Sequence, residues 1–421
     1  MPTALARTQT RSAAGTDRQG ERRVEPSDRL DIAGLRADTP GAAHRIHLNN
    51  AGAGLMPAPV VAAVKDHIDL EAMRGGYEAA DMKADAVSAV YASVGRLLNA
   101  GSDEIALTEN ATVAWQMAFY AQRFRPGDRI LTARAEYAAN YVAFLQMARR
   151  TGVTIEVVPD DETGALDPDA LAAMMDERVK LVAITWIPTN GGLINPAAEV
   201  GKIARRHGVT YLLDACQAVG QLPVDVEEIG CDLLAATGRK FLRGPRGTGF
   251  LYVRRSLLET LEPAMIDHFG APWIEADRYS LRPDARRFET WEKNYAARLG
   301  LGAAVDYALG LGLDAIRARC LALTERLRAE LERIPSVSLH DLGHERAAIV
   351  SCSFDGHAAE CIRSYMARQA INVSVSRPSS TLLDATTRGL PTVLRASPHY
   401  YNTDEEIDQF VGAVKDALGS R

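Results

Sequence analysis

Short apolar runs alternate with helix-like segments between about residue 100 and residue 255. The apolar runs have the length of buried strands, and the segments between them carry apolar residues at helical spacing. Strands that alternate with helices predict an α/β fold, with a mostly parallel sheet covered by helices on both faces. Ligands of such sheets bind beyond the carboxyl ends of the strands, so we expect the functional residues there. The predicted strands are EIAL, RILTA, TIEVV, KLVAIT, TYLLD and DLLAA, and the predicted helices include TVAWQMAFYAQRF, PDALAAMMDE and PAAEVGKIARRHG.

The pattern changes after about residue 295. A long amphipathic stretch, LDAIRARCLALTERLRAELERI, predicts a helix. A strand (AAIVSCSF), a helix (AAECIRSYMARQA), short strands (INVSVS and TVLRAS) and a last helix follow it. Thr403 and Glu406 have the spacing of a capping box at the start of that last helix. We therefore expect a large domain over residues 76–295 and a smaller α+β domain over residues 296–421.

Composition and charge narrow the functional classes. The chain has 421 residues and a net charge of −6. This charge lacks the positive excess that is typical of nucleic-acid-binding proteins, so we expect no nucleic-acid partner. We expect no membrane association, because no apolar run approaches the length of a membrane helix. Five cysteines without a CxxC pair suggest neither a zinc cluster nor a disulfide framework, and they fit the reducing cytoplasm. Residues 1–27 are poor in large apolar side chains, which predicts a disordered tail that is not a secretory signal.

An acid and a lysine each follow a predicted strand. Asp214 ends TYLLD, and Lys240 lies after DLLAA in the segment TGRKFLRGPRGTG. An acid in this position can be a structural cap or half of a buried salt bridge, and most lysines are solvated. Pyridoxal phosphate (PLP) enzymes use both groups, a lysine for the Schiff base and an acid against the pyridinium nitrogen. Nucleotide binding is disfavoured, because a strand follows GPRGTG and TGRK lacks a GK[ST] ending.

The segment DACQAVGQLPVDVEEIGCDLLAATGRKFLRGPRGTGFLYV resembles the class V aminotransferase group of fold-type I PLP enzymes. This group includes cysteine desulfurases, selenocysteine lyases, isopenicillin N epimerases and the C–S lyases of ergothioneine biosynthesis. The resemblance extends from LNNAGAGLMP to the last helix and implies a mostly parallel, seven-stranded sheet in the large domain. It also implies an amino-acid substrate, a homodimer with the site at the subunit interface, and a segment 28–75 that packs on the small domain.

The resemblance assigns a role to each matching residue. Lys240 would form the Schiff base and act as proton shuttle, and Arg395 and Asn50 would bind the substrate, Arg395 through its carboxylate. The cofactor would be held by Asp214 at the ring nitrogen, Gln217 at the phenolic oxygen, Thr237 with the amides of Ala111 and Thr112 at the phosphate, Tyr137 stacked on the ring, and Thr189 or Asn190 as a polar contact. Thr112 can also be a plain helix N-cap, and Tyr137 can be core packing.

Three departures from the family pattern affect the reaction. Arg239 replaces the usual histidine before the lysine, and it can still reach the phosphate. The segment RRFETWEKN replaces the one that reaches the neighbouring subunit's phosphate. The loop SVSRPSSTLLDATTRG has Ser379 where desulfurases carry their cysteine nucleophile, while Cys352 and Cys361 are predicted to be buried structural residues.

A serine cannot replace a thiolate in persulfide chemistry. The sequence therefore favours β-elimination on an S-substituted cysteine, which gives pyruvate and ammonia. Epimerisation, transamination and decarboxylation use the same groups and remain open. A persulfide-type desulfurase and a non-catalytic protein on a PLP fold are less favoured.

Overall fold

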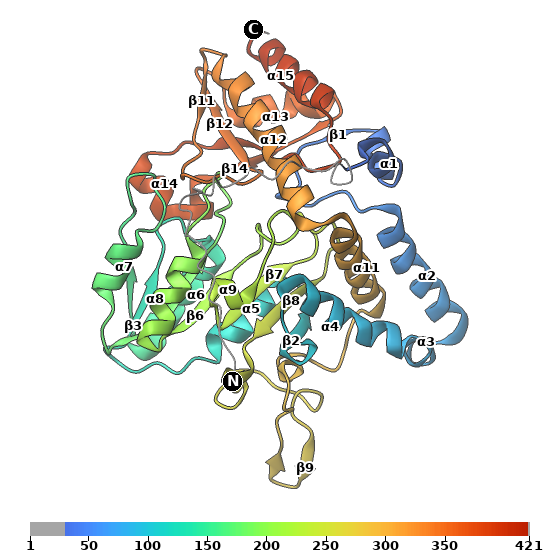
Figure 1. Cartoon of the computed structure of the whole chain (residues 1–421), viewed down its shortest axis with the longest axis vertical. Coiled ribbons are helices and arrows are strands. Elements are labelled where there is room, and N and C mark those ends of the chain that lie inside the picture. Colours follow the sequence, from blue (N-terminus) through green and yellow to red (C-terminus); the bar gives the residue numbers. More distant parts are fainter. Residues whose placement is uncertain (1–29, 420–421) are drawn as a thin grey trace, which may run out of the picture.

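The computed structural model describes residues 30–419, so the predicted tail at residues 1–27 lies outside the described residues. A seven-stranded sheet with the order β2-β8-β7-β6-β5-β3-β4 forms the centre of the large domain (Figure 1). Strand β8 is antiparallel to both of its neighbours, and the other pairings are parallel. The strands are β2 (Ile105–Thr108), β3 (Arg129–Thr132), β4 (Thr154–Val157), β5 (Val179–Thr185), β6 (Thr210–Asp214), β7 (Leu233–Thr237) and β8 (Gly249–Val253). The predicted α/β class and sheet are confirmed.

Helices cover both faces of this sheet, as the apolar runs predicted. Leu181 and Ala183 of β5 belong to one apolar cluster, and Val182 and Ile184 belong to another. Alternate side chains of the strand are thus buried on opposite faces, which explains why the run is continuously apolar. The helices of this domain are α4 (Ala84–Leu98), α5 (Ala111–Tyr120), α6 (Ala138–Thr151), α7 (Pro168–Met174), α8 (Ala197–His207), α9 (Val226–Ile229) and α10 (Arg255–Leu258).

The C-terminal part forms a smaller sheet with the order β11-β12-β15-β14. The predicted capping box is present, because Thr403 N donates to Glu406 Oε2 and Glu406 N donates to Thr403 Oγ1, both at 3.2 Å. The elements are α12 (Leu313–Glu332), β11 (Val337–Leu339), β12 (Val350–Phe354), α13 (Ala359–Arg368), β13 (Ile371–Asn372), β14 (Ser374–Ser376), α14 (Leu382–Arg388), β15 (Val393–Ala396) and α15 (Asp404–Gly419).

One burial prediction in this domain is wrong. Cys352 is buried on β12, but Cys361 is exposed on α13. The buried side chains of that helix are Ala359, Ile362 and Met366, at the three- and four-residue spacing of a single helix face. Cys361 lies off this face and therefore points to solvent.

The N-terminal segment contacts both domains. Strand β1 (Ile46–His47) pairs with β13, and α1 (Ile32–Ala37) precedes it. Helix α2 (Ala58–Arg74) packs against α11 (Tyr295–Leu311), which apart from Tyr295 falls in the range 296–421 predicted for the small domain but packs on α4 of the large domain. Helix α3 (Gly76–Met82) lies between the end of α2 and the start of α4 (Figure 1).

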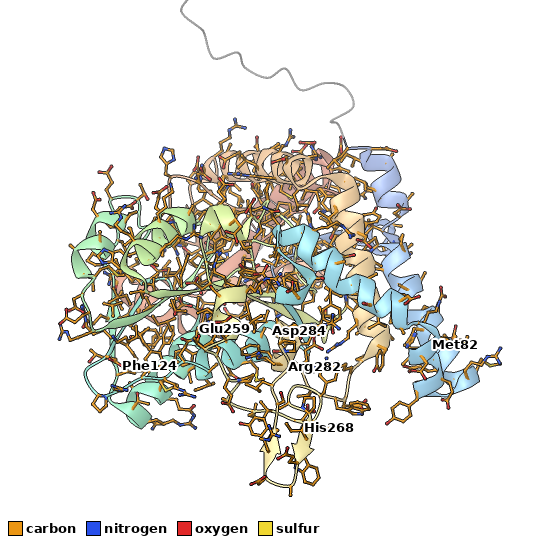
Figure 2. The ribbon with its side chains drawn as sticks, turned by 60° about the horizontal axis from the view of Figure 1, so that its bottom comes forward. Met82, Phe124, Glu259, His268, Arg282 and Asp284 are labelled. Carbon is orange, nitrogen blue, oxygen red and sulfur yellow. The ribbon has the colours of Figure 1, made fainter. Side chains whose placement is uncertain are left out.

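A hairpin of β9 (Trp273–Glu275) and β10 (Arg278–Tyr279) projects from the body of the large domain (Figure 1). Its base is beside His268 and Arg282, and Met82 lies at the outer end of α3 (Figure 2). No single helix within residues 30–419 has the length and apolar character to cross a membrane. Only when α11 and α12 are taken together, as a pair bent by 81°, are that length and composition reached.

Candidate active site

A cavity of about 420 Å³ lies where the sequence placed the chemistry, beyond the carboxyl ends of β5, β6 and β7 and beside the start of α5. The lining includes Asp214, Lys240 and other side chains from five separate stretches of sequence. The full lining is Asn110, Ala111, Thr112, Val113, Tyr137, Thr185, Ile187, Thr189, Asp214, Cys216, Gln217, Thr237, Arg239 and Lys240.

Lys240 lies in a tight turn after β7. Gly244 N donates to Gly238 O at 2.7 Å and closes the turn around the lysine. Burial lowers the pKa of the Lys240 amine below its ordinary value, and the nearby Arg239 and Arg395 lower it further. No carboxylate forms an ion pair with Lys240 in the described part of the chain. The amine is therefore a candidate nucleophile and base rather than a solvated surface lysine.

Asp214 is buried at the end of β6, with 5% of its surface exposed. Its Oδ2 accepts a hydrogen bond from Asn140 Nδ2 at 2.9 Å, and its Oδ1 accepts one from Cys216 N at 3.0 Å. Within residues 30–419 no lysine or arginine pairs with it, which rules out the salt-bridge alternative there. A buried carboxylate without a cation is expected to meet a positively charged ligand atom.

The start of α5 forms an anion-binding cradle. The cap is Asn110, whose Oδ1 accepts from Val113 N at 3.0 Å, so the interpretation of Thr112 as the N-cap is wrong. Ala111 and Thr112 are the first helical residues, and their amides have no acceptor within the helix. A Cβ on Gly249 would lie 2.5 Å from Asn110 C, so only glycine lets β8 approach the helix start this closely.

Gln217 has one unpaired polar atom at the cavity. Its Nε2 donates to Ala51 O at 3.1 Å, while its buried Oε1 has no partner. Tyr137 is the N-cap residue of α6 and is 38% exposed, so it is not core packing. Thr237 is buried at the end of β7, and its hydroxyl donates to Thr248 O at 3.2 Å.

The structure distinguishes Thr189 from Asn190, the two candidates for the polar contact to the cofactor. Thr189 lines the cavity, whereas Asn190 Nδ2 donates to Thr381 Oγ1 at 2.8 Å and its Oδ1 accepts from Ser376, which fastens this loop to the small domain. Arg395 lies directly behind Thr189, because its Nη1 donates to Thr189 O at 3.0 Å and to Thr189 Oγ1 at 2.6 Å. Burial lowers the pKa of Arg395 to about 10.

Asn50 is not among the residues that line the cavity. Its Nδ2 donates to Ser397 O at 2.8 Å and to His47 O at 3.3 Å, and its Oδ1 accepts from Tyr401 Oη at 2.7 Å. These contacts join the N-terminal segment to the small domain. Arg239 does line the cavity, and its guanidinium donates to the backbone carbonyl of Gly52.

Sequence reasoning missed two groups at the site. Cys216 lines the cavity, and burial together with Asp214 raises the pKa of its thiol well above the ordinary value. Glu136 is buried immediately before Tyr137 and is linked to Asp214 through Asn140. The position of Glu136 after the predicted strand RILTA was the available signal, because a strand-end acid had already identified Asp214.

The residues present fit PLP. The cavity offers a buried amine, a carboxylate without a cation, an unpaired amide oxygen and a helix start that attracts phosphate. Arg239 lines the cavity, whereas Arg395 does not line it and contacts Thr189, which does. Neither arginine has an ion-pair partner in the described part of the chain, so both positive charges can attract anionic groups of a cofactor or substrate.

Comparison with known proteins agrees with this geometry. The aminotransferase class-V model matches residues 46–410. A probable cysteine desulfurase of Methanothermobacter thermautotrophicus is 30% identical over 91% of this chain and 98% of its own length. A probable cysteine desulfurase of Halobacterium salinarum is 32% identical over 92% of this chain and 97% of its own length.

Solved structures show the same fold. Apo cysteine desulfurase from Thermococcus onnurineus has a TM-score of 0.85 at 26% identity and covers 92% of this chain and 98% of its own. The cystine C–S lyase C-DES has a TM-score of 0.81 at 23% identity, covers 90% of this chain and 99% of its own, and supports the fold alone. The chain belongs to the class V aminotransferase family and is a PLP-dependent enzyme.

Proposed function

We propose that this enzyme is a C–S β-lyase, which acts on an S-substituted cysteine and releases pyruvate, ammonia and a thiol. The observation that carries the proposal is the lack of a reactive thiol beside a complete set of cofactor and carboxylate groups. The loop after β14 contains Ser379 and no cysteine. Asn190 ties that loop to the site through Thr381 and Ser376.

The positions of the five cysteines support this choice. Cys231, Cys320 and Cys352 are buried, and Cys361 is exposed on α13. Only Cys216 lines the cavity, and its raised pKa keeps it a thiol rather than the thiolate that attacks sulfur. Transfer of substrate sulfur to a protein cysteine is therefore disfavoured.

We propose that PLP is held by residues that line the cavity. These are Lys240, Asp214, Gln217, Thr237, Thr189, Tyr137, Arg239 and the amides of Ala111 and Thr112. When bound, PLP supplies an electron sink for the carbanion at Cα. Asp214 would keep the ring nitrogen protonated, and Tyr137 would cover the ring. The helix start, Thr237 and Arg239 would meet the phosphate.

Two residues would act on the substrate. Arg395 would bind the carboxylate, because a buried guanidinium without an acidic partner gains a charge-assisted contact when a carboxylate arrives. Lys240 would remove the Cα proton, since the lowered pKa leaves more of its amine uncharged. The Cβ–S bond then breaks, the thiol leaves, and water completes the release of pyruvate and ammonia.

The test is an incubation of PLP-loaded enzyme in heavy water with S-conjugated cysteines, cystine and free L-cysteine, followed by mass spectrometry. Pyruvate and a thiol from a conjugate would support the lyase. Alanine from L-cysteine would instead support a desulfurase, the activity named for the curated relatives. Cys216→Ser is the matched control, because a lyase keeps its rate and a desulfurase that used this thiol would lose it.

Other reactions of the same groups give different products. Deuterium at Cα of recovered amino acid without pyruvate would indicate an epimerase or an aminotransferase, which the configuration of the product and a keto acid then distinguish. Loss of carbon dioxide would indicate decarboxylation. A protein that binds no PLP would refute the whole assignment.

We also propose a homodimer that buries the exposed apolar side chains of α2, α3 and the projecting hairpin. Met73, Tyr77 and Trp273 are 71% to 80% exposed, which is unusual for large apolar residues. A cavity of about 680 Å³ lies beside Tyr77, Trp291 and Lys293. Light scattering is expected to give twice the chain mass, and an active monomer would contradict the proposal.

A further inference from the structure

A second buried carboxylate lies next to the site. Glu136 follows β3 and is 3% exposed, and within residues 30–419 it pairs with no cation. It accepts hydrogen bonds from Tyr137 N, Thr185 N and Asn140 Nδ2, each at 2.9 Å. The hydroxyls of Thr185 and Thr132 also donate to it, the latter at 3.2 Å. The ends of β3 and β5 and the start of α6 therefore fix its position.

Asn140 joins this carboxylate to Asp214. Its Nδ2 donates to Glu136 Oε1 and to Asp214 Oδ2, both at 2.9 Å. An amide nitrogen carries two hydrogens, so one is available for each carboxylate. Glu136 therefore helps to fix the direction in which Asn140 presents its second hydrogen to Oδ2 of Asp214, while Cys216 N holds Oδ1.

We propose that Glu136 is a positioning residue, which orients Asp214 through Asn140 and strengthens the hold of Asp214 on the proton of the cofactor's ring nitrogen. The inference rests on the proposed role of Asp214 in PLP binding. It adds a residue, Glu136, that makes no contact with the cavity itself.

The electrostatics give the direction of the effect. Burial raises the pKa of Glu136 to about 7, hydrogen bonds from Thr185 and Asn140 oppose that rise, and Asp214 adds to it. Burial raises the pKa of the Tyr211 phenol on β6, and Glu136 adds to that rise. As the pH rises through neutrality, Glu136 gains a negative charge beside Asp214. That charge makes it harder to remove the proton of the cofactor's ring nitrogen, which Asp214 would contact.

The test uses PLP labelled with ¹⁵N in the ring and follows the nitrogen chemical shift against pH in the holoenzyme. Glu136→Gln keeps the shape and removes the charge, so the ring nitrogen is expected to lose its proton at a lower pH than in the wild type. Asn140→Ser breaks the bridge and is expected to shift the midpoint in the same direction. It also serves as the second variant if Glu136→Gln does not fold.

Glu289→Gln is the control, because Glu289 is a buried carboxylate bonded to Tyr91 and Arg298, outside the cavity. It is expected to lower stability without moving the midpoint of the ring-nitrogen titration. An unchanged midpoint in both Glu136→Gln and Asn140→Ser would overturn the inference and leave Glu136 a purely structural residue. Failure of the wild type to bind PLP would instead overturn the proposed function, so the two failures are distinguishable.

Discussion

Replacing Glu136 with glutamine should change how the stability of the apoprotein depends on pH. Burial raises the pKa of this carboxyl from 4.5 to about 7 in the folded protein. The folded state therefore keeps a proton that the unfolded state loses between these two pH values. The stability associated with protonated Glu136 is fully present below pH 4.5 and is lost as the pH rises through about 7.

The size of the effect follows from the two pKa values. A rise from 4.5 to about 7 corresponds to about 3 kcal/mol of unfolding free energy, at roughly 1.4 kcal/mol per pKa unit. Glutamine cannot ionise, so the variant lacks this decline. Its NH2 group replaces one carboxylate oxygen and so faces one N–H donor, Tyr137 N at the Oε1 position or Thr185 N at the Oε2 position. That mismatch adds a cost of about 1–3 kcal/mol that does not depend on pH.

The assay is urea unfolding of wild type and variant apoprotein at the same protein concentration, followed by tryptophan fluorescence at a series of pH values. The unfolding free energy of Glu136→Gln minus that of the wild type should rise by about 3 kcal/mol from acidic to neutral pH. Glu289→Gln is the control. It is expected to be less stable than the wild type at neutral pH, because buried Arg298 loses its carboxylate. A constant difference between Glu136→Gln and wild type would refute the reasoning.

Four further substitutions test the site and the fold. Lys240→Ala should abolish turnover while circular dichroism stays unchanged, and substantial residual activity would exclude Lys240 as the base. Arg395→Gln should raise KM for the amino acid about 10–100-fold, since a charge-assisted hydrogen bond contributes about 1.5–3 kcal/mol, and an unchanged KM would place the carboxylate elsewhere. Gly249→Ala should weaken PLP binding measured by fluorescence titration, because its Cβ would meet Asn110 C at 2.5 Å, while Gly412→Ala, with open space around it, should not. Thr403→Ala should cost about 1 kcal/mol in urea unfolding through loss of the helix cap, and an unchanged midpoint would show that the cap contributes nothing.

The sequence predicted the elements that depend on local pattern. The runs RILTA, KLVAIT, TYLLD and DLLAA became central strands, because strands buried on both faces need apolar side chains at nearly every position. The runs EIAL and TIEVV became the edge strands β2 and β4, and the prediction that TIEVV is a buried strand is wrong, because β4 has a neighbouring strand on one side alone and is only partly buried. Asp214 and Lys240 were found for the same reason, since polar residues at the ends of such runs reach the edge of the sheet where ligands bind. The capping box at Thr403 is a contact between near neighbours and required nothing beyond the sequence.

Tertiary structure decided the contacts between distant segments. Thr189 and Asn190 are adjacent in sequence, yet one lines the cavity and the other joins a loop of the small domain, because the chain turns between them. The face of α13 that meets the small domain's sheet determined that Cys361 is exposed.

The link from Glu136 to Asp214 is the clearest case of a feature that the folded chain alone reveals. It exists because β5 lies beside both β3 and β6, and because α6 begins over the end of this sheet. The sequence therefore located Asp214 and Lys240 after the strands that bring them to the cavity, but it did not identify Glu136 or Cys216. Packing of the strands determined which of these residues share a hydrogen bond, since that depends on the order of strands in the sheet rather than on their order in the chain.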